Sequence, residues 1–309
     1  MTHLLDALQT ADRLPWAGLV AEMALLLQDS SVSISPRLVQ SLGGGASLFV
    51  MPAVDSHTAI TKLITFTPAN AGTHRPTIQG DVTVFDIATG QRRLLLDGPT
   101  VTARRTAAVT VLAAQTLAPD TQGPLLIVGA GVQGKAHLEA FAAVLGTRQV
   151  MIASRSTPNA EQLVLHAQSM GIDAQLVLDA NAALASCPLA VTCTPANSIV
   201  LSATPRPDAF ISAVGAFTPS MAELSAGLCQ HMARHGTIWL DTVDARHEAG
   251  DLLQADLDLS TMATLGDVVR QNAPKPTGPV LFKSCGWAGW DLAAARLAMR
   301  QMEGGSIGV

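Results

Sequence analysis

The chain has 309 residues, of which 48% are hydrophobic and 14% are charged, and its formal net charge is −5 at pH 7. This length allows two well-buried domains, and the composition excludes the disordered and low-complexity classes of protein. A mildly acidic chain without a basic cluster also gives no reason to expect nucleic acid or an anionic membrane as a partner.

The first hundred residues predict a mixed domain of helices and short strands. Apolar residues recur at helical spacing in residues 1–29, and strand patterns follow at 47–52 and 59–66. Residues 83–87 and 92–96 flank a polar turn and predict a β-hairpin. The domain is therefore expected to be α+β.

The domain boundary is expected after an alanine-rich helix at 102–117, which stops before Pro119. Residues 120–124 form a polar connection to the next strand. A Pro/Gly-rich link at 272–279 should lead a strand at 280–283 and a helix at 291–302 back to the first domain. We therefore expect one domain from 1–117 with 279–309, and a second from 118–278.

The segment 125–134 carries the clearest functional signal. A short apolar strand at 125–128 runs into Gly129-Ala130-Gly131-Val132-Gln133-Gly134, and a helical pattern follows. This strand, G-x-G-x-x-G turn and helix favour binding of a dinucleotide. Its pyrophosphate can approach the glycine backbone and the positive end of the helix.

The end of the next strand indicates which dinucleotide is preferred. Residues 149–153 end in Ser154-Arg155-Ser156, where an NAD-preferring site usually carries a carboxylate for the ribose hydroxyl. Arg155 with two hydroxyls can instead hold a 2′-phosphate, so NADPH is expected to be preferred, with NADH possible. The alternative is that Arg155 is a solvated surface cation.

Strand and helix patterns alternate through the rest of the second domain, which predicts a parallel sheet with right-handed crossovers. The expected fold class is α/β, a doubly wound Rossmann domain beside the mixed α+β domain. Further strands are expected at 174–177, 190–194, 210–214 and 238–241. Thr192 and Thr194 end one of these strands and are expected to border the cofactor.

Several short segments, taken together and in order, resemble the ornithine cyclodeaminase and mu-crystallin family. The segments are Pro36-Arg37, Met51-Pro52-Ala53, Thr61-Lys62-Leu63, Thr77-Ile78-Gln79-Gly80, Asp97-Gly98, Ala103-Arg104-Arg105-Thr106-Ala107-Ala108, Gly129-Ala130-Gly131-Val132-Gln133, Ala213-Val214-Gly215, Glu248-Ala249-Gly250-Asp251-Leu252 and Phe282-Lys283-Ser284. The resemblance implies a homodimer, with a substrate and dimerisation domain built from both chain ends. It also places Val214 and Gly215 at the cofactor.

Three cations in these segments match the family's carboxylate-binding positions, namely Arg37, Lys62 and Arg105. An arginine fork and a mobile lysine charge suit the carboxylate of a small imino or amino acid. Lys62 lies in an apolar strand pattern, so an inward ammonium would need an anionic partner. Lys62 and Arg105 are the candidate catalytic residues. The alternatives are an edge-strand lysine, a helix-surface Arg105 and a loop cation at Arg37.

The informative departure from the family is Phe217. True cyclodeaminases carry an aspartate at this position, which acts as the acid and base in ammonia loss. A phenyl ring cannot transfer a proton, and such help is typically worth about 10²–10⁴-fold in rate. Glu223 could substitute, but its position favours a helix start. Phe217 would pack on the substrate ring or fill the core.

Members of the family that lack this aspartate include imine reductases, so the resemblance implies hydride transfer from NAD(P)H to a cyclic ketimine acid. The resemblance implies conversion of Δ1-pyrroline-2-carboxylate to L-proline and of Δ1-piperideine-2-carboxylate to L-pipecolate. The alternatives are ornithine cyclodeamination, reductive amination of a keto acid, and a mu-crystallin-like NADP-dependent binding protein. No metal site is expected. The cysteines form no C-x-x-C pair and no signal-peptide or membrane-spanning pattern occurs, so we expect a cytoplasmic protein.

Overall fold

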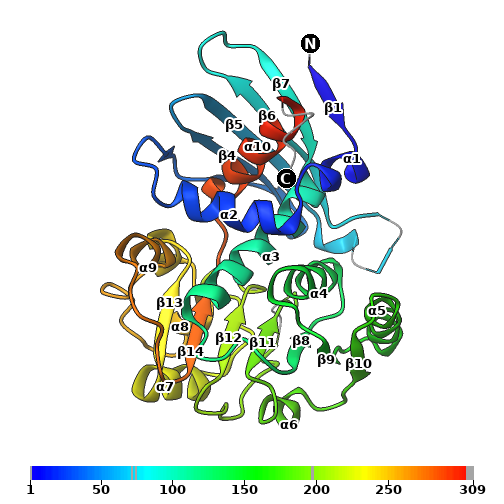
Figure 1. Cartoon of the computed structure of the whole chain (residues 1–309), viewed down its shortest axis with the longest axis vertical. Helices are drawn as coiled ribbons and strands as arrows, with labels where there is room; N and C mark the ends of the chain where they lie inside the picture. Colours follow the sequence, from blue (N-terminus) through cyan, green and yellow to red (C-terminus); the bar gives the residue numbers. More distant parts are fainter. Residues whose placement is uncertain (1, 71, 74, 196–197, 304–309) are drawn as a thin grey trace. The chain divides into compact units, whose positions relative to one another are not determined.

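A computed structural model describes residues 2–70, 72–73, 75–195 and 198–303. The chain divides into two compact units, one of Met1–Arg105 with Trp287–Val309 and the other of Thr106–Gly286. Figure 1 shows the two units with a sheet in each.

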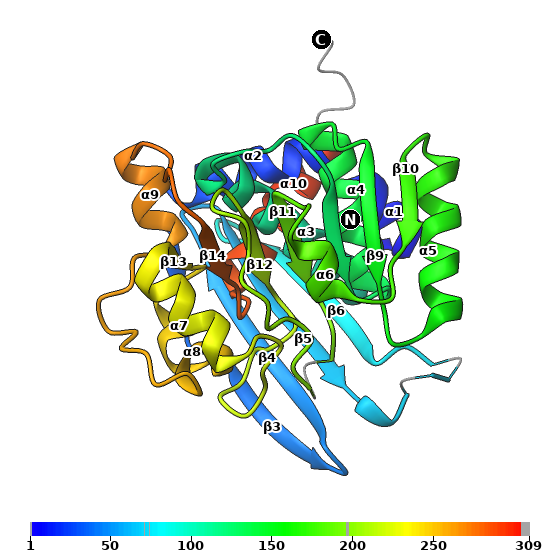
Figure 2. The same ribbon diagram turned by 90° about the horizontal axis from the view of Figure 1, so that it is seen from below.

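The sheet of the first unit is mixed and takes the order β1-β7-β6-β5-β4-β2, with β3 also paired to β4. Its strands are β1 (His3–Leu5), β2 (Ser33–Ile34), β3 (Leu38–Gly43), β4 (Ala46–Val54), β5 (Thr58–Phe66), β6 (Ile78–Asp86) and β7 (Arg92–Asp97). The pairs from β3 to β7 are antiparallel, whereas β1 pairs parallel with β7. Figure 2 shows β3, β4 and β5 side by side. The predicted hairpin is confirmed by the β6–β7 pairing.

Helices cover one face of this sheet. They are α1 (Ala7–Asp12), α2 (Trp16–Leu26) and α10 (Ala288–Glu303), and the unit also contains a short 3-10 turn, η1 (Pro68–Asn70). The helix α10 contacts α2, β4 and β5. Ile60, Lys62 and Ile64 alternate along β5 and are all buried, so they share the covered face.

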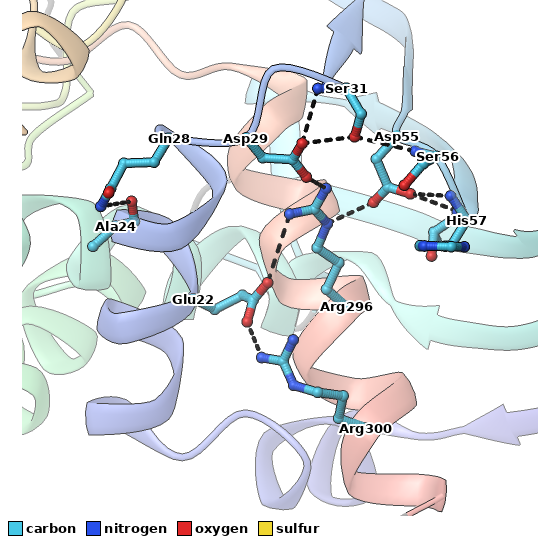
Figure 3. Close-up of polar contacts among 11 residues, drawn as sticks. Glu22, Ala24, Gln28, Asp29, Ser31, Asp55, Ser56, His57, Arg296 and Arg300 are labelled. Atoms are coloured by element: carbon cyan, nitrogen blue, oxygen red, sulfur yellow. Dashed lines mark hydrogen bonds and ion pairs between the residues drawn. The ribbon is translucent and has the colours of Figure 1, made fainter. Parts of the chain in front are cut away.

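An ion-pair network attaches α10 to its neighbours in the first unit. Figure 3 shows Arg296 of α10 between Asp29 and Asp55, with its guanidinium 2.6 Å and 2.5 Å from their carboxylate oxygens. Glu22 of α2 is 2% exposed and pairs with both Arg296 and Arg300. Because these carboxylates come from three separate segments, the network joins the C-terminal helix to the N-terminal half of the unit.

The opposite face of the sheet is apolar and open. Leu38, Val50 and Leu63 are paired in register across β3, β4 and β5, so they lie side by side. Leu38 is 55% exposed and Leu63 is 48% exposed. An apolar face with this exposure has the character of an interaction surface.

The second unit contains a fully parallel sheet in the order β10-β9-β8-β11-β12-β14-β13. Its strands are β8 (Leu125–Val128), β9 (Gln149–Ala153), β10 (Asp173–Leu176), β11 (Leu189–Thr192), β12 (Phe210–Ala213), β13 (Thr237–Leu240) and β14 (Val280–Lys283). The central strands are buried on both faces, as their continuous apolar sequences require. The predicted doubly wound α/β class is confirmed.

Helices connect the strands of this sheet. They are α4 (Val132–Leu145), α5 (Thr157–Ser169), α6 (Ala180–Leu184), α7 (Ala226–His235), α8 (Gly250–Leu253) and α9 (Leu265–Gln271), with one 3-10 turn, η2 (Val243–His247). The chain builds outward from β8 through β9 to β10, and then from β11 on the other side. The strand order therefore reverses between β8 and β11, where ligands of open parallel sheets bind at the carboxyl edge.

Both limits of the second domain differ from those expected. The strand Val280–Lys283 pairs with β12 and β13 of the second sheet, so its predicted return to the first domain is wrong. Its residues are completely buried and apolar apart from Lys283, which suits a central parallel strand. The other boundary falls within α3 (Gly98–Leu117), between Arg105 and Thr106, whereas we expected it at the end of this helix.

In the part of the chain that the structure describes, no helix combines the length and apolar character needed to cross a membrane.

Candidate active site

The glycine turn after β8 has the geometry that the motif predicts. Gly129 has φ +118°, and a Cβ there would lie 2.7 Å from the carbonyl oxygen of Cys193. A Cβ at Gly134 would collide with the carbonyl of Gly129. Gly131 is the N-cap of α4, without a side-chain cap, and a Cβ there would meet open space.

These features fit a dinucleotide phosphate. The first-turn N–H groups of α4 lack a capping side chain, and Gly131 leaves room for a ligand to approach the backbone. In the same turn, the Oε1 atom of Gln133 is buried without a hydrogen-bond partner. A buried acceptor of this kind normally has a donor, which a bound ligand can supply.

The end of β9 presents Arg155 at the surface. The Ser156 hydroxyl caps α5 by accepting from the N–H of Asn159 at 3.5 Å. The Ser154 hydroxyl accepts from the N–H of Ser156 at 3.2 Å. Arg155 is exposed between them, and it forms no ion pair with any described residue. Its guanidinium is therefore accessible to a ligand phosphate.

The carboxyl ends of β11 and β12 meet on a buried glutamate. The Oε2 atom of Glu223 accepts from the Thr192 hydroxyl at 2.9 Å and from the N–H of Gly215 at 2.7 Å. The Oε1 atom accepts from the N–H and the hydroxyl of Thr194, at 2.7 and 2.8 Å. The N–H of Val214 donates to the carbonyl of Thr192. One carboxylate thus joins the two predicted cofactor-binding loops.

Two more buried charged residues, Asp251 and Lys283, fix the backbone at Glu223. The Oδ1 atom of Asp251 accepts from the backbone N–H groups of Glu223 and Leu224, at 2.6 and 2.8 Å. Its Oδ2 atom lies 2.6 Å from the Nζ atom of Lys283. Burial raises the pKa of Glu223, while Lys283 and the N–H of Thr194 oppose that shift. Burial alone would lower the pKa of Lys283, but the charge of Asp251 raises it.

The expectation that Glu223 starts or caps a helix is wrong. The N-cap of α7 is Ser225, whose hydroxyl accepts from the N–H of Leu228. Glu223 is 0% exposed, and four donors occupy its carboxylate. It is therefore also unsuited to replace the missing catalytic aspartate, because proton transfer needs an accessible group.

In the first unit, Lys62 and Arg105 share a buried carboxylate. The Nζ atom of Lys62 lies 3.1 Å from the Oδ1 atom of Asp291, and the Nε atom of Arg105 lies 3.4 Å from the same oxygen. Lys62 is 1% exposed and Asp291 is 0% exposed. The Nε atom of Arg105 is buried without a well-formed hydrogen bond. Two buried cations thus share one anion.

The charges of this cluster act on one another. Burial lowers the pKa of Lys62 to about 8, Asp291 opposes this shift, and the positive charges of Arg105 and Arg37 add to it. Arg37 is partly buried and comes from the segment before β3. The structure therefore brings Lys62 and Arg105 to one carboxylate, and the charge of Arg37 also acts on the pKa of Lys62. A ligand carboxylate would relieve their mutual repulsion.

Phe217 belongs to the second unit, where it is partly buried and packs against the apolar core. Its predicted contact with substrate stays a prediction. Among the described residues, no group of three or more His, Cys, Asp or Glu side chains could hold a metal ion.

Two important side chains, Asp291 and His137, are not identified from the sequence. Asp291 is the one carboxylate in the apolar stretch 288–295, which is a usable signal. His137 of α4 is 0% exposed and contacts the carbonyl of Gln133 at 2.8 Å and the hydroxyl of Thr110 at 3.1 Å. Burial lowers the pKa of His137 to about 4, so it is neutral near pH 7.

The chain is similar over nearly its whole length to two named reductases. A Δ1-pyrroline-2-carboxylate reductase of Burkholderia multivorans is 38% identical over 305 residues, which cover 96% of this chain and 95% of the relative. A Δ1-pyrroline-2-carboxylate/Δ1-piperideine-2-carboxylate reductase of Azospirillum brasilense is 36% identical over 95% of this chain and 94% of its own length.

The fold is also found among solved structures. The Δ1-pyrroline-2-carboxylate reductase of Thermococcus litoralis, solved with NADH and L-proline, superposes with a TM-score of 0.84 at 21% identity. The match covers 99% of this chain and 96% of that protein. The profile of the ornithine cyclodeaminase/mu-crystallin family matches residues 17–306. The chain therefore belongs to the ornithine cyclodeaminase/mu-crystallin family.

Proposed function

We propose that the protein is an NAD(P)H-dependent reductase of cyclic ketimine acids. Its substrates would be Δ1-pyrroline-2-carboxylate, which yields L-proline, and Δ1-piperideine-2-carboxylate, which yields L-pipecolate. The observation that carries this proposal is the sharing of Asp291 by Lys62 and Arg105, because a substrate carboxylate is the anion that this pair lacks. The activities named for the Burkholderia and Azospirillum relatives agree with it.

The cations would bind and orient the substrate. Arg105 and Lys62 would hold the carboxylate next to the imine carbon, with Arg37 adding positive charge. When bound, the reduced nicotinamide supplies the hydride. A protonated C=N group is already a strong electrophile, so the protein would mainly need to position the substrate and exclude water. The absence of an acid at Phe217 is compatible with this reaction.

The cofactor would be held by the second unit. The Gly129–Gly134 turn and the start of α4 would bind the pyrophosphate. Thr194, Val214 and Gly215 would border the nicotinamide half, and Arg155 would contact the 2′-phosphate of NADPH. We infer a preference for NADPH from Arg155, with NADH as a second substrate.

The protein is also proposed to form a homodimer. The exposed apolar face that contains Leu38, Val50 and Leu63 supports this, and a second copy of the chain would cover it. Leu63→Asp should convert the dimer to a monomer in analytical ultracentrifugation. A wild-type monomer at micromolar concentration would contradict the proposal. A cytoplasmic location stays a prediction.

The decisive experiment is a substrate panel assayed with NADPH and with NADH. Both cyclic ketimines should be reduced, whereas ornithine should release no ammonia and keto acids with ammonia should react slowly. Ammonia release from ornithine would favour a cyclodeaminase despite Phe217. Tight cofactor and ligand binding without turnover of any compound would favour a mu-crystallin-like binding protein.

A matched pair of arginine variants tests the substrate site. Arg105→Ala should raise the KM for the ketimine by about two orders of magnitude, because a carboxylate loses a charged partner. Arg104 stacks on Trp16 and donates to the carbonyl of Leu14, so Arg104→Ala should leave KM near the wild-type value. Equal KM values for the two variants would remove Arg105 from the site.

A further inference from the structure

The buried carboxylate of Glu223 sets the direction of two backbone peptide groups. It accepts from the N–H of Thr194 after β11 and from the N–H of Gly215 after β12. Every described peptide bond is trans, so the N–H and the preceding C=O of each peptide point in opposite directions. The carbonyls of Cys193 and Val214 are therefore directed away from Glu223.

The surroundings allow little freedom in this arrangement. A Cβ at Gly215 would collide with the carbonyl of Thr194 and would lie 2.5 Å from the Oε1 atom of Glu223. The Cys193 carbonyl, in turn, lies close against Gly129 of the glycine turn. The three loops after β8, β11 and β12 are therefore fitted to one another around a single carboxylate.

The position of Glu223 is itself fixed by Asp251 and Lys283. Asp251 holds the backbone of Glu223 and Leu224, and Lys283 of β14 pairs with Asp251. Glu223, Asp251 and Lys283 are each no more than 1% exposed. Burying three charges is costly, and such a network persists where it fixes one conformation.

We propose that Glu223 is a positioning residue for the nicotinamide half of the cofactor. By holding the N–H groups of Thr194 and Gly215 inward, it would direct the Cys193 and Val214 carbonyls outward at the carboxyl edge of the sheet. Outward carbonyls accept hydrogen bonds, so they suit the carboxamide N–H groups of a nicotinamide. This inference rests on the proposed function, because it assumes that the second unit binds NAD(P)H.

The variant Glu223→Gln tests the role of the carboxylate without changing its shape. A glutamine places an NH2 group where one carboxylate oxygen was, and that group faces the N–H of either Thr194 or Gly215. The hydroxyls of Thr192 and Thr194 can rotate to accept instead, but a backbone N–H cannot. One of the two loops must therefore lose its hydrogen bond.

Binding should be measured by isothermal titration calorimetry with two probes. These are NADPH and adenosine 2′,5′-bisphosphate, which resembles the adenine half alone. Glu223→Gln should weaken NADPH binding about tenfold and change binding of the bisphosphate less than about twofold. Glu161 is an exposed glutamate on α5, and Glu161→Gln is the matched control. It should change the dissociation constant of neither probe.

The outcomes separate this inference from the proposed function. An equal loss of affinity for both probes in Glu223→Gln, or no loss of affinity for either, would overturn the role of Glu223. A wild-type protein that binds neither probe would instead refute the proposed function. If Glu223→Gln does not fold, Thr192→Val removes one donor to the same carboxylate at nearly constant volume. It should then weaken NADPH binding selectively, by a smaller factor, and the absence of this selectivity would likewise overturn the inference.

Discussion

Replacing Asp291 by asparagine should make substrate binding depend on pH in a new range. Asp291 is the only described carboxylate paired with Lys62, at 3.1 Å, and both side chains are buried. Asparagine keeps the shape and an acceptor oxygen but removes the negative charge. The ammonium of Lys62 would then lie next to Arg105 with no anion to balance the two charges.

The magnitude follows from the geometry. At 3.1 Å and an effective dielectric constant of about 20, the attraction between the charges of Lys62 and Asp291 is about 5 kcal/mol, an upper limit before relaxation. Opposite charges at this range typically move a pKa by about one to three pH units. The pKa of Lys62, about 8 in the wild type, should therefore fall to about 7 or below in the variant. At pH 7.5 the fraction of protonated Lys62 should decrease about threefold or more.

The assay is the pH dependence of kcat/KM for ketimine reduction. In the wild type, kcat/KM should decline above about pH 8 as Lys62 loses its proton. In Asp291→Asn the same decline should begin at least about one pH unit lower. Lowering the pH should bring KM back towards the wild-type value. This recovery at lower pH distinguishes a charge effect from damage to the fold.

A matched control uses a partly buried carboxylate of the same unit that does not contact Lys62. Asp86 pairs with Arg93, so Asp86→Asn should leave the pH profile unchanged. If Asp291→Asn and the wild type had the same alkaline decline, the pairing of Asp291 with Lys62 would not control substrate binding.

Three further predictions address the cofactor site and the stability of the fold. Arg155→Asp should lower the ratio of kcat/KM with NADPH to that with NADH at least about tenfold, and an unchanged ratio would show that another group contacts the 2′-phosphate. His137 stays neutral down to about pH 4 when folded but binds a proton below about 6.5 when unfolded. The free energy of unfolding should therefore decrease by about 3 kcal/mol as the pH falls from about 6.5 to about 4. Urea titrations of His137→Gln should not show this pH-dependent decrease. Arg296→Leu leaves the carboxylate of Asp55 buried without its charged partner and removes one of the two arginines that pair with Glu22. It should reduce the free energy of unfolding by about 3 kcal/mol, and a loss below about 1 kcal/mol would mean that the network of Figure 3 contributes little.

The strands of the second unit could be predicted from the sequence because their signals are local. The apolar run Leu125–Val128 and the strand Gln149–Ala153 have the predicted limits. Such strands are buried on both faces, and the turns that bound them contain glycine or polar residues. The glycine motif was equally predictable, since the positive φ of Gly129 and the close contact of Gly134 with the carbonyl of Gly129 both arise within the motif.

The partner of Lys62 could not be predicted in this way. Asp291 lies 229 residues further along the chain, and only the packing of α10 against β5 brings the two together. The sequence pattern indicated that an inward lysine would need an anion, and the substrate was the natural candidate. The structure shows a resident carboxylate as well, so the site combines a permanent anion with the predicted cations.

The assignment of Glu223 failed for a related reason. A glutamate just before a helix resembles a first-turn residue, and its true partners lie on the loops after β11 and β12 and on Asp251. Long-range partners leave no periodic trace in the sequence. The misplaced boundary at Val280 has the same origin, because only the ladder with β12 and β13 reveals which sheet the strand completes.

The segment from Ala213 to Leu224 separates two tasks that a cyclodeaminase would combine. Position 217 would supply the proton-transferring acid, and here a phenylalanine packs against the core instead. Six residues later Glu223 holds both predicted cofactor-binding loops through four hydrogen bonds. Phe217 contributes to none of those four bonds. The conformation of the two predicted cofactor-binding loops therefore does not depend on an acid at position 217, which is compatible with the proposed hydride transfer to an already protonated imine.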